Sequence, residues 1–256
     1  MGAYIELHAR SAFSFLLGAS LPGNLVSRVA ELGLSGLAIC DRNGFYGSPR
    51  QWTASLEAGV RAIYGCELTL EDGSALPVLV RTTAGYQSLC RLLSHAALRA
   101  PKGMAAVLWR ELEEVAGGSI CLTGDEEGPI VQALLRNDLA GAETMLRRLV
   151  RIFGSSNVYV EVQRHLRRGE RWLNARLVDL ARATGTPLLA TNGVLYSEPA
   201  GRRVLDIFTC ARSHTSLDQA GTALSLNGER HLKSPAQMQA LFADLPVAIT
   251  NTARVA

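Results

Sequence analysis

Lysine is almost missing from this 256-residue sequence: of its 26 basic residues, only Lys102 and Lys233 are lysines. With 23 acidic residues the formal net charge is just +3, so the chain is only mildly basic. We interpret the excess of arginine first as a genomic bias in composition, and only second as a sign of phosphate binding. No apolar run reaches about 18 residues and no signal peptide precedes the first strand-like segment, so we expect no membrane span.

Cysteine is also scarce, and the five cysteines are an odd number with none at C-x-x-C spacing. This pattern argues against a disulfide framework and a zinc ribbon, and it favours buried thiols in a reducing cytoplasm. Neither a G-x-G-x-x-G stretch nor a Walker loop is present, which makes a nucleotide-binding fold less attractive. The chain is 48% hydrophobic, so its core should be large enough to fold without a metal or a disulfide.

Strand-like and helix-like segments alternate along the chain, which predicts an α/β fold: either a parallel β/α barrel or an open doubly wound sheet. A turn with the sequence EDGSA should pair the third and fourth strands. The last stretch, LPVAITNTARVA, is typical of a helix without a stop signal, so we expect a piece of a longer protein. The expected strands cover 4–8, 37–40, 61–70, 76–80, 119–124, 157–163 and 188–192.

Polar residues end, follow or lie within several of these strands. In a β/α barrel the carboxyl ends of the strands meet at one mouth, where such side chains would form a metal or an acid–base site. Each residue also has a plainer interpretation: a hydrogen-bonded strand end, a turn acid, an ion-paired carboxylate or a solvated histidine. The candidates are His8, Asp41, Glu67, His165 and Asn192.

Eight segments, in order through nearly the whole chain, resemble the N-terminal PHP (polymerase and histidinol phosphatase) domain of bacterial C-family DNA polymerases, most closely the error-prone branch. The resemblance implies a distorted seven-stranded β/α barrel, TIM-like, over residues 1–196, with a helical extension over 197–256 that leads toward a polymerase body. The segments are ELHARSAFSFLLGAS, LAICDRNGFYG, GCELTLEDG, GYQSLCRLLSHA, LTGDEEGP, YVEVQRH, LLATNGVLY and ERHLKSPAQMQALF.

The family's metal-binding members carry histidine and carboxylate ligands at the barrel mouth. By position, His8, Asp41, Glu67 and His165 match this pattern, and they are the ligands to expect if any metal binds. The pattern fails at four further positions, which read Arg10, Arg42, Gly193 and Leu195. His95 is a further, weaker match to a middle ligand position.

The two arginines could fill the place of the metal and neutralise Asp41 and Glu67, because a guanidinium is permanently charged and suits carboxylates. We therefore expect a degenerate site without a metal and assign no catalytic residue.

The function that this resemblance implies is a structural scaffold within an error-prone DNA polymerase of DNA repair. Its catalytic Mg²⁺ would belong to the polymerase body. Expected partners are that body, primer–template DNA indirectly and damage-response accessory proteins, in the cytoplasm and without a membrane. Two alternatives stay open: an active Zn²⁺- or Mn²⁺-dependent phosphoesterase, either a 3′–5′ proofreading exonuclease or a small-molecule phosphatase, and a stand-alone binding module for a repair partner.

The segment 147–182 is rich in arginine. It could track phosphates near DNA, or it could simply be a solvated helix face. The candidate phosphate contacts are Arg164, Arg167, Arg168 and Arg171.

Overall fold

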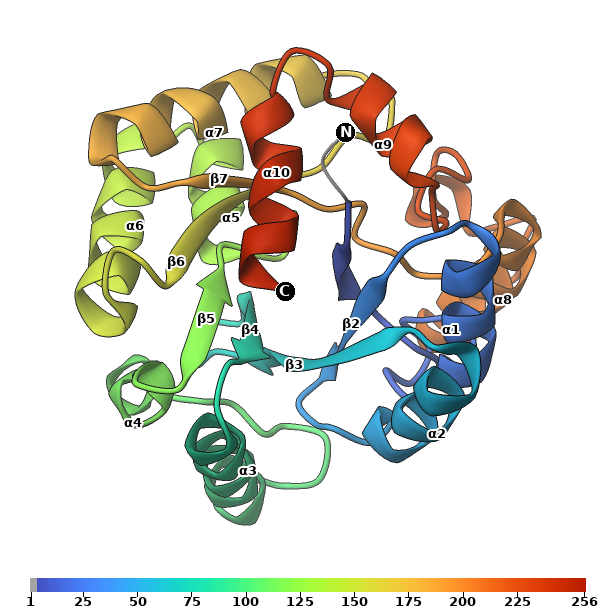
Figure 1. The fold of residues 1–256 in the computed structure, drawn as a ribbon, viewed down its shortest axis with the longest axis horizontal. Coiled ribbons are helices and arrows are strands. Elements are labelled where there is room, and N and C mark those ends of the chain that lie inside the picture. The colour runs from blue at the N-terminus through green and yellow to red at the C-terminus, as the bar shows by residue number, and fades with distance from the viewer. Residues whose placement is uncertain (1–3) are drawn as a thin grey trace.

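The computed structural model describes residues 4–256, which form one seven-stranded sheet in the order β1 to β7 (Figure 1). All seven predicted strands are present. Their bounds are β1 (Glu6–Ala9), β2 (Gly36–Arg42), β3 (Arg61–Thr69), β4 (Ala75–Val80), β5 (Ser119–Leu122), β6 (Val158–Val162) and β7 (Leu188–Ala190).

The sheet curls until its two edges meet. Ala9 at the end of β1 bridges Val194 beyond β7, where Arg10 N donates to Val194 O at 2.8 Å and Val194 N donates to His8 O at 3.0 Å. This seam makes the sheet a distorted seven-stranded β/α barrel, as predicted, and not an open doubly wound sheet. The barrel is not wholly parallel, because the tight turn after β3 makes β4 antiparallel to both β3 and β5.

Ten α-helices lie in the described part of the chain, and most of them surround the barrel (Figure 1). Several begin with proline in their first turn, where its missing N–H has no helical partner to lose. The helix that begins at Ser48 has Gly47 at its N-cap position. The bounds are α1 (Pro22–Glu31), α2 (Ser48–Ala58), α3 (Thr83–Leu98), α4 (Glu113–Ala116), α5 (Pro129–Leu135), α6 (Leu139–Phe153), α7 (Glu170–Thr184), α8 (Arg202–Arg212), α9 (Pro235–Leu241) and α10 (Pro246–Val255).

The helix α10 lies across the centre of the ring of strands (Figure 1). Asn251 Nδ2 donates to Leu188 O at 2.7 Å, and Thr252 Oγ1 accepts from Ile5 N at 3.1 Å. Val255 packs against an apolar cluster inside the barrel that includes Leu7, Leu79 and Leu189. The last helix of the expected extension thus covers the end of the barrel where the strands begin, which leaves the opposite end as the mouth.

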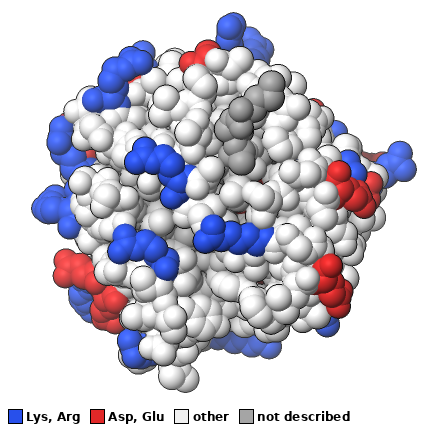
Figure 2. Space-filling model, in the orientation of Figure 1, with Lys and Arg blue, Asp and Glu red and all other residues white. Residues whose placement is uncertain are grey.

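The surface around α10 carries basic side chains near its centre, whereas acidic side chains lie toward the edge of this face (Figure 2). No helix within residues 4–256 is long and apolar enough to cross a bilayer. The five cysteines are free thiols, as the odd count and the spacing predicted.

Candidate functional site at the barrel mouth

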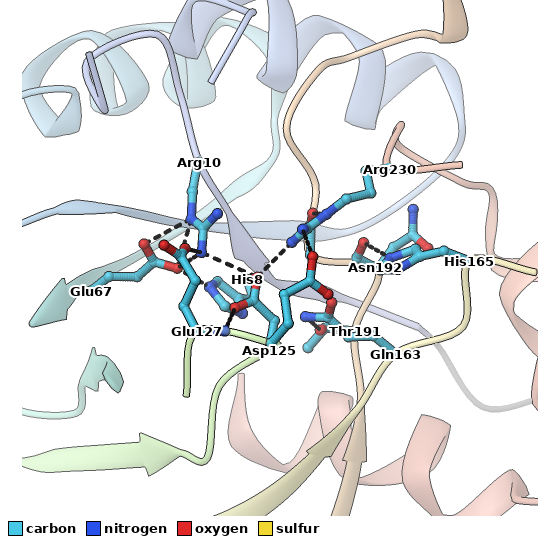
Figure 3. Close-up of polar contacts among 12 residues, drawn as sticks. His8, Arg10, Glu67, Asp125, Glu127, Gln163, His165, Thr191, Asn192 and Arg230 are labelled. Atoms are coloured by element: carbon cyan, nitrogen blue, oxygen red, sulfur yellow. Dashed lines mark hydrogen bonds and ion pairs between the residues drawn. The ribbon is translucent and has the colours of Figure 1, made fainter. Parts of the chain in front are cut away.

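Glu67, on β3, contacts both sequence-predicted arginines of the mouth, and Arg10 lies beside it in Figure 3. Arg10 Nε lies 2.7 Å from both of its carboxylate oxygens, and Arg42 Nε donates to Oε2 at 2.9 Å. Burial alone would raise the pKa of Glu67, but Arg10, His8 and Arg42 outweigh it and hold the pKa well below its usual range. Glu67 is therefore a carboxylate whose oxygens already face cationic donors.

His8, at the end of β1, is enclosed by two carboxylates. Its Nε2 lies 2.6 Å from Glu67 Oε1 and its Nδ1 lies 2.7 Å from Glu161 Oε1 on β6. Burial lowers the pKa of His8, but Glu161 and Glu67 reverse this and raise it to about 10. Both ring nitrogens thus face carboxylate oxygens, an arrangement that favours the protonated imidazolium.

The loop after β5 supplies further acids to the two arginines. Arg10 Nη2 lies 3.1 Å from Asp125 Oδ2 and 2.9 Å from Glu127 Oε2. Arg42 Nη2 lies 2.6 Å from the same oxygen of Glu127. Neither acid was a sequence candidate, although both stand in the LTGDEEGP segment directly after a predicted strand, a signal that could have identified them.

A third guanidinium, that of Arg230, reaches the mouth from the segment before α9 (Figure 3). Its Nη2 lies 2.7 Å from Asp125 Oδ2, and its Nε donates to Gly193 O at 2.8 Å. Gly193 has φ +52°, and a Cβ added there would lie 2.7 Å from Arg230 Nη2 and 2.5 Å from Gln163 Oε1. Arg230 therefore occupies space that a side chain at position 193 would need, and no sequence pattern pointed to it.

Asp41, at the end of β2, has different partners from those expected. It accepts hydrogen bonds from Ser11 N at 2.8 Å, from Ser11 Oγ at 2.8 Å and from Ser14 Oγ at 2.7 Å. Burial raises its pKa, and the hydrogen bonds from Ser14 and Ser11 oppose that rise. The prediction that an arginine would pair with a mouth carboxylate is confirmed for Glu67, whereas two serines satisfy Asp41.

His165, after β6, lies beyond Arg230 from Glu67 in the view of Figure 3. Its Nε2 lies 2.9 Å from Asn192 O and must donate to that carbonyl, while Nδ1 has no hydrogen-bond partner. Burial, with Arg230 adding to it, lowers the pKa of His165 to about 3, so the ring is neutral. Leu195 is buried against Tyr196, and His95 is exposed on α3.

The four candidate phosphate-binding arginines differ in their surroundings. Arg164 pairs with Asp244 at 2.6 Å, and Arg167 pairs with Glu126 at 2.6 Å. Arg168 and Arg171 are exposed. Two of the four are thus engaged within the chain, and a role in phosphate binding stays a prediction for all of them.

The donor chemistry of the mouth does not suit a metal ion. A metal ligand must present a free lone pair, whereas both nitrogens of His8 already face carboxylate oxygens and Glu67 faces two guanidinium groups. Within residues 4–256, no group of three or more His, Cys, Asp or Glu side chains is placed to hold a metal.

Comparison with known proteins identifies the family. The PHP domain model matches residues 6–165. An error-prone DNA polymerase of Mycobacterium bovis is 38% identical over 99% of this chain and 24% of its own length. An error-prone DNA polymerase of Caulobacter vibrioides is 34% identical over 98% of this chain and 22% of its own length.

Among solved structures, a lesion-specific endonuclease from Pyrococcus furiosus is 11% identical, with a TM-score of 0.48 over 76% of this chain and 49% of that one. A likeness at this level carries no argument about chemistry. The chain spans about a quarter of the length of the two polymerases that it matches. The predicted resemblance is confirmed by the family match and by these relatives: the chain belongs to the PHP domain family.

Proposed function

We propose that this chain is the PHP domain of an error-prone DNA polymerase and that it serves there as a structural scaffold. Its relatives carry that name and are about four times as long, which supports a place within a larger polymerase polypeptide. In this proposal nucleotide transfer, with its Mg²⁺, belongs to the polymerase body, as do the contacts with primer–template DNA and with accessory proteins.

The observation that carries the proposal is the set of three guanidinium groups at the mouth, from Arg10, Arg42 and Arg230. They neutralise Glu67, Glu127 and Asp125, as a metal cluster would neutralise its ligands. A guanidinium cannot act as a Lewis acid or activate a water molecule, which is the main contribution of a metal to phosphoester hydrolysis. The residues at this mouth are therefore better suited to neutralising one another's charge and holding the barrel rigid than to hydrolysing a phosphoester.

The same contacts join several strands and loops of the barrel. Glu67 on β3 is tied to β1 through His8 and to β2 through Arg42. Asp125 connects the seam residue Arg10 with Arg230 near the end of the chain. Charge-assisted hydrogen bonds of this kind are stronger than neutral ones and hold their groups in defined geometry. The mouth would therefore fix the barrel as a firm platform for the polymerase body.

The competing function is a metal-dependent phosphoesterase, since His8, Asp41, Glu67 and His165 keep the family's residue types. An assay with added Zn²⁺ or Mn²⁺ separates the two functions, with p-nitrophenyl phosphate and a 3′-recessed DNA as substrates. We expect background turnover only. Turnover that Glu67→Gln abolishes would overturn the scaffold proposal in favour of the phosphoesterase.

A further inference from the structure

Beside β3 and β4, the outer surface of the barrel lacks the helix that connects two neighbouring parallel strands elsewhere. These two strands are joined by a turn, so no crossover helix lies between them in sequence. Two clefts of about 810 Å³ and 550 Å³ lie on the outer surface between α2 and α3. They share Phe45 and Pro49 and therefore adjoin each other, and the two together are named the groove.

The groove follows the full length of α3. One cleft is lined by Thr83 and Tyr86 in the first turn of this helix, and the other by residues from Cys90 to Ala97 in its later turns. Because α3 has 16 residues, the groove is about 24 Å long at ~1.5 Å per residue. That length and its position between two helices suit one further helix of about four turns.

The lining of the groove is apolar and aromatic. Trp52 is 53% exposed and Tyr46 is 64% exposed, while the rings of Phe45 and Tyr86 contact each other in a tilted arrangement with centroids 4.9 Å apart. Single exposed apolar residues are ordinary, but a contiguous exposed patch marks an interaction surface. Aromatic residues in a concave surface are the usual anchors of protein interfaces.

The charges around the groove favour a partner that carries acidic residues. Among the described residues, no Asp or Glu lines either cleft, whereas Arg81 lines one cleft and Lys102 lines the other. A helix with an apolar face and acidic residues toward its ends fits this surface, in the manner of other helix-in-groove contacts.

We infer that the groove between α2 and α3 is the docking site for an amphipathic helix of the polymerase body, within the same polypeptide. The inference rests on the proposed function. Its support is the length of the relatives, about three quarters of which lies outside the region that this chain matches. Domains of one chain commonly bury some 600–1,500 Å² against each other, and this groove is a surface of suitable chemistry.

Photo-crosslinking in the full-length polymerase tests the inference. A photoreactive phenylalanine analogue replaces Trp52 in the groove, or, as a matched control, Trp172 on α7, which is 42% exposed. Mass spectrometry then maps the crosslinked peptides. We expect Trp52 to give intramolecular crosslinks to a helix of the polymerase body, with a yield several-fold higher than that of Trp172.

Three outcomes would overturn the inference: equal yields at the two positions, crosslinks from Trp52 to a second copy of the protein, or crosslinks only to a separate protein. Failure of the scaffold proposal is a separate result. It would appear as metal-dependent hydrolysis at the mouth, which this crosslinking does not measure. A native polypeptide that ends near Ala256 would contradict both the scaffold proposal and the docking inference. The length of the purified native protein tests this point directly.

Discussion

The guanidinium of Arg10 and the carboxylate of Glu67 form a buried ion pair at the barrel mouth. Arg10 Nε lies 2.7 Å from each carboxylate oxygen of Glu67, and the two side chains are only 5% and 1% exposed. Arg10 is thus within direct hydrogen-bonding distance of Glu67, the residue that matches a metal-ligand position of the PHP family. The predictions below follow from this pair and the groups around it.

Replacing Arg10 with alanine should destabilise the protein strongly. The change leaves Glu67, Asp125 and Glu127 with fewer cations in a buried site, and breaking a buried pair costs about 3–5 kcal/mol. The free energy of unfolding from urea titration measures this loss.

Arg147→Ala is the matched control for Arg10→Ala. Arg147 pairs with Glu143 on the exposed face of α6, where such helix pairs contribute about 0.3–0.5 kcal/mol. Equal losses in the two variants would show that the mouth pairs add no stability beyond that of a surface pair.

Arg42→Ala should lower stability by less than Arg10→Ala does. The Arg42 side chain is 17% exposed, so water can partly replace it beside Glu67 and Glu127. Both variants should nevertheless melt at lower temperature than Arg147→Ala. A melting temperature unchanged by Arg42→Ala would mean that this cation has no structural role at the mouth.

Stability should fall as pH rises from about 6.5 to 10. The pKa of His8 is raised to about 10 in the folded chain, against about 6.5 for an unfolded histidine. The folded state therefore binds the proton more tightly, and its stabilising effect is complete below pH ~6.5 and lost as pH rises through the folded pKa. Urea midpoints at pH 7 and pH 10 measure this difference.

His8→Gln separates this titration from that of other groups. Burial raises the pKa of Cys40, Cys66 and Tyr4, so these groups also weaken the folded state at alkaline pH. The variant keeps those groups and lacks only the histidine, so its stability should fall less between the two pH values. Parallel losses in both proteins would assign the alkaline effect to the other groups.

Gly193 and Arg230 should be energetically coupled. Gly193→Ala forces an L side chain into φ +52° and against Arg230, and alanine at a positive φ is destabilising. Arg230→Ala removes one of the two groups that the new Cβ meets. In a double-mutant cycle, the double variant should lose less stability than the sum of the two single variants. Strict additivity would show that Arg230 does not restrict position 193.

The seven strands could be predicted from the sequence because each carries its own apolar pattern and turn signals. The pattern left a barrel and an open sheet both possible, and the resemblance to PHP domains implied the barrel. The pairing of Arg10 and Arg42 with a mouth carboxylate was also expected, since the family resemblance placed both arginines at ligand positions of the mouth. Arg230 was not predictable in this way. It lies far along the chain, and only the folded loop before α9 brings it to Gly193 and Asp125.

The partners of Asp41 illustrate a second limit. A carboxylate at a strand end next to arginines suggests an ion pair, yet the loop after β1 turns so that Ser11 and Ser14 reach it first. Hydroxyl groups carry no charge pattern and occur throughout loops, so their role depends on backbone geometry. His165 is a similar case, because the fold directs its ring to the carbonyl of Asn192.

The metal content of the purified protein tests the central claim most directly. After dialysis against metal-free buffer, elemental analysis should find far less than one zinc or manganese ion per chain, because arginines fill the mouth and both nitrogens of His8 already face carboxylates. The double variant Arg10→His, Arg42→His should not restore binding, since Arg230 still fills the space beside Gly193. One or more tightly held ions per chain in the wild-type protein, lost on Glu67→Gln, would contradict the account.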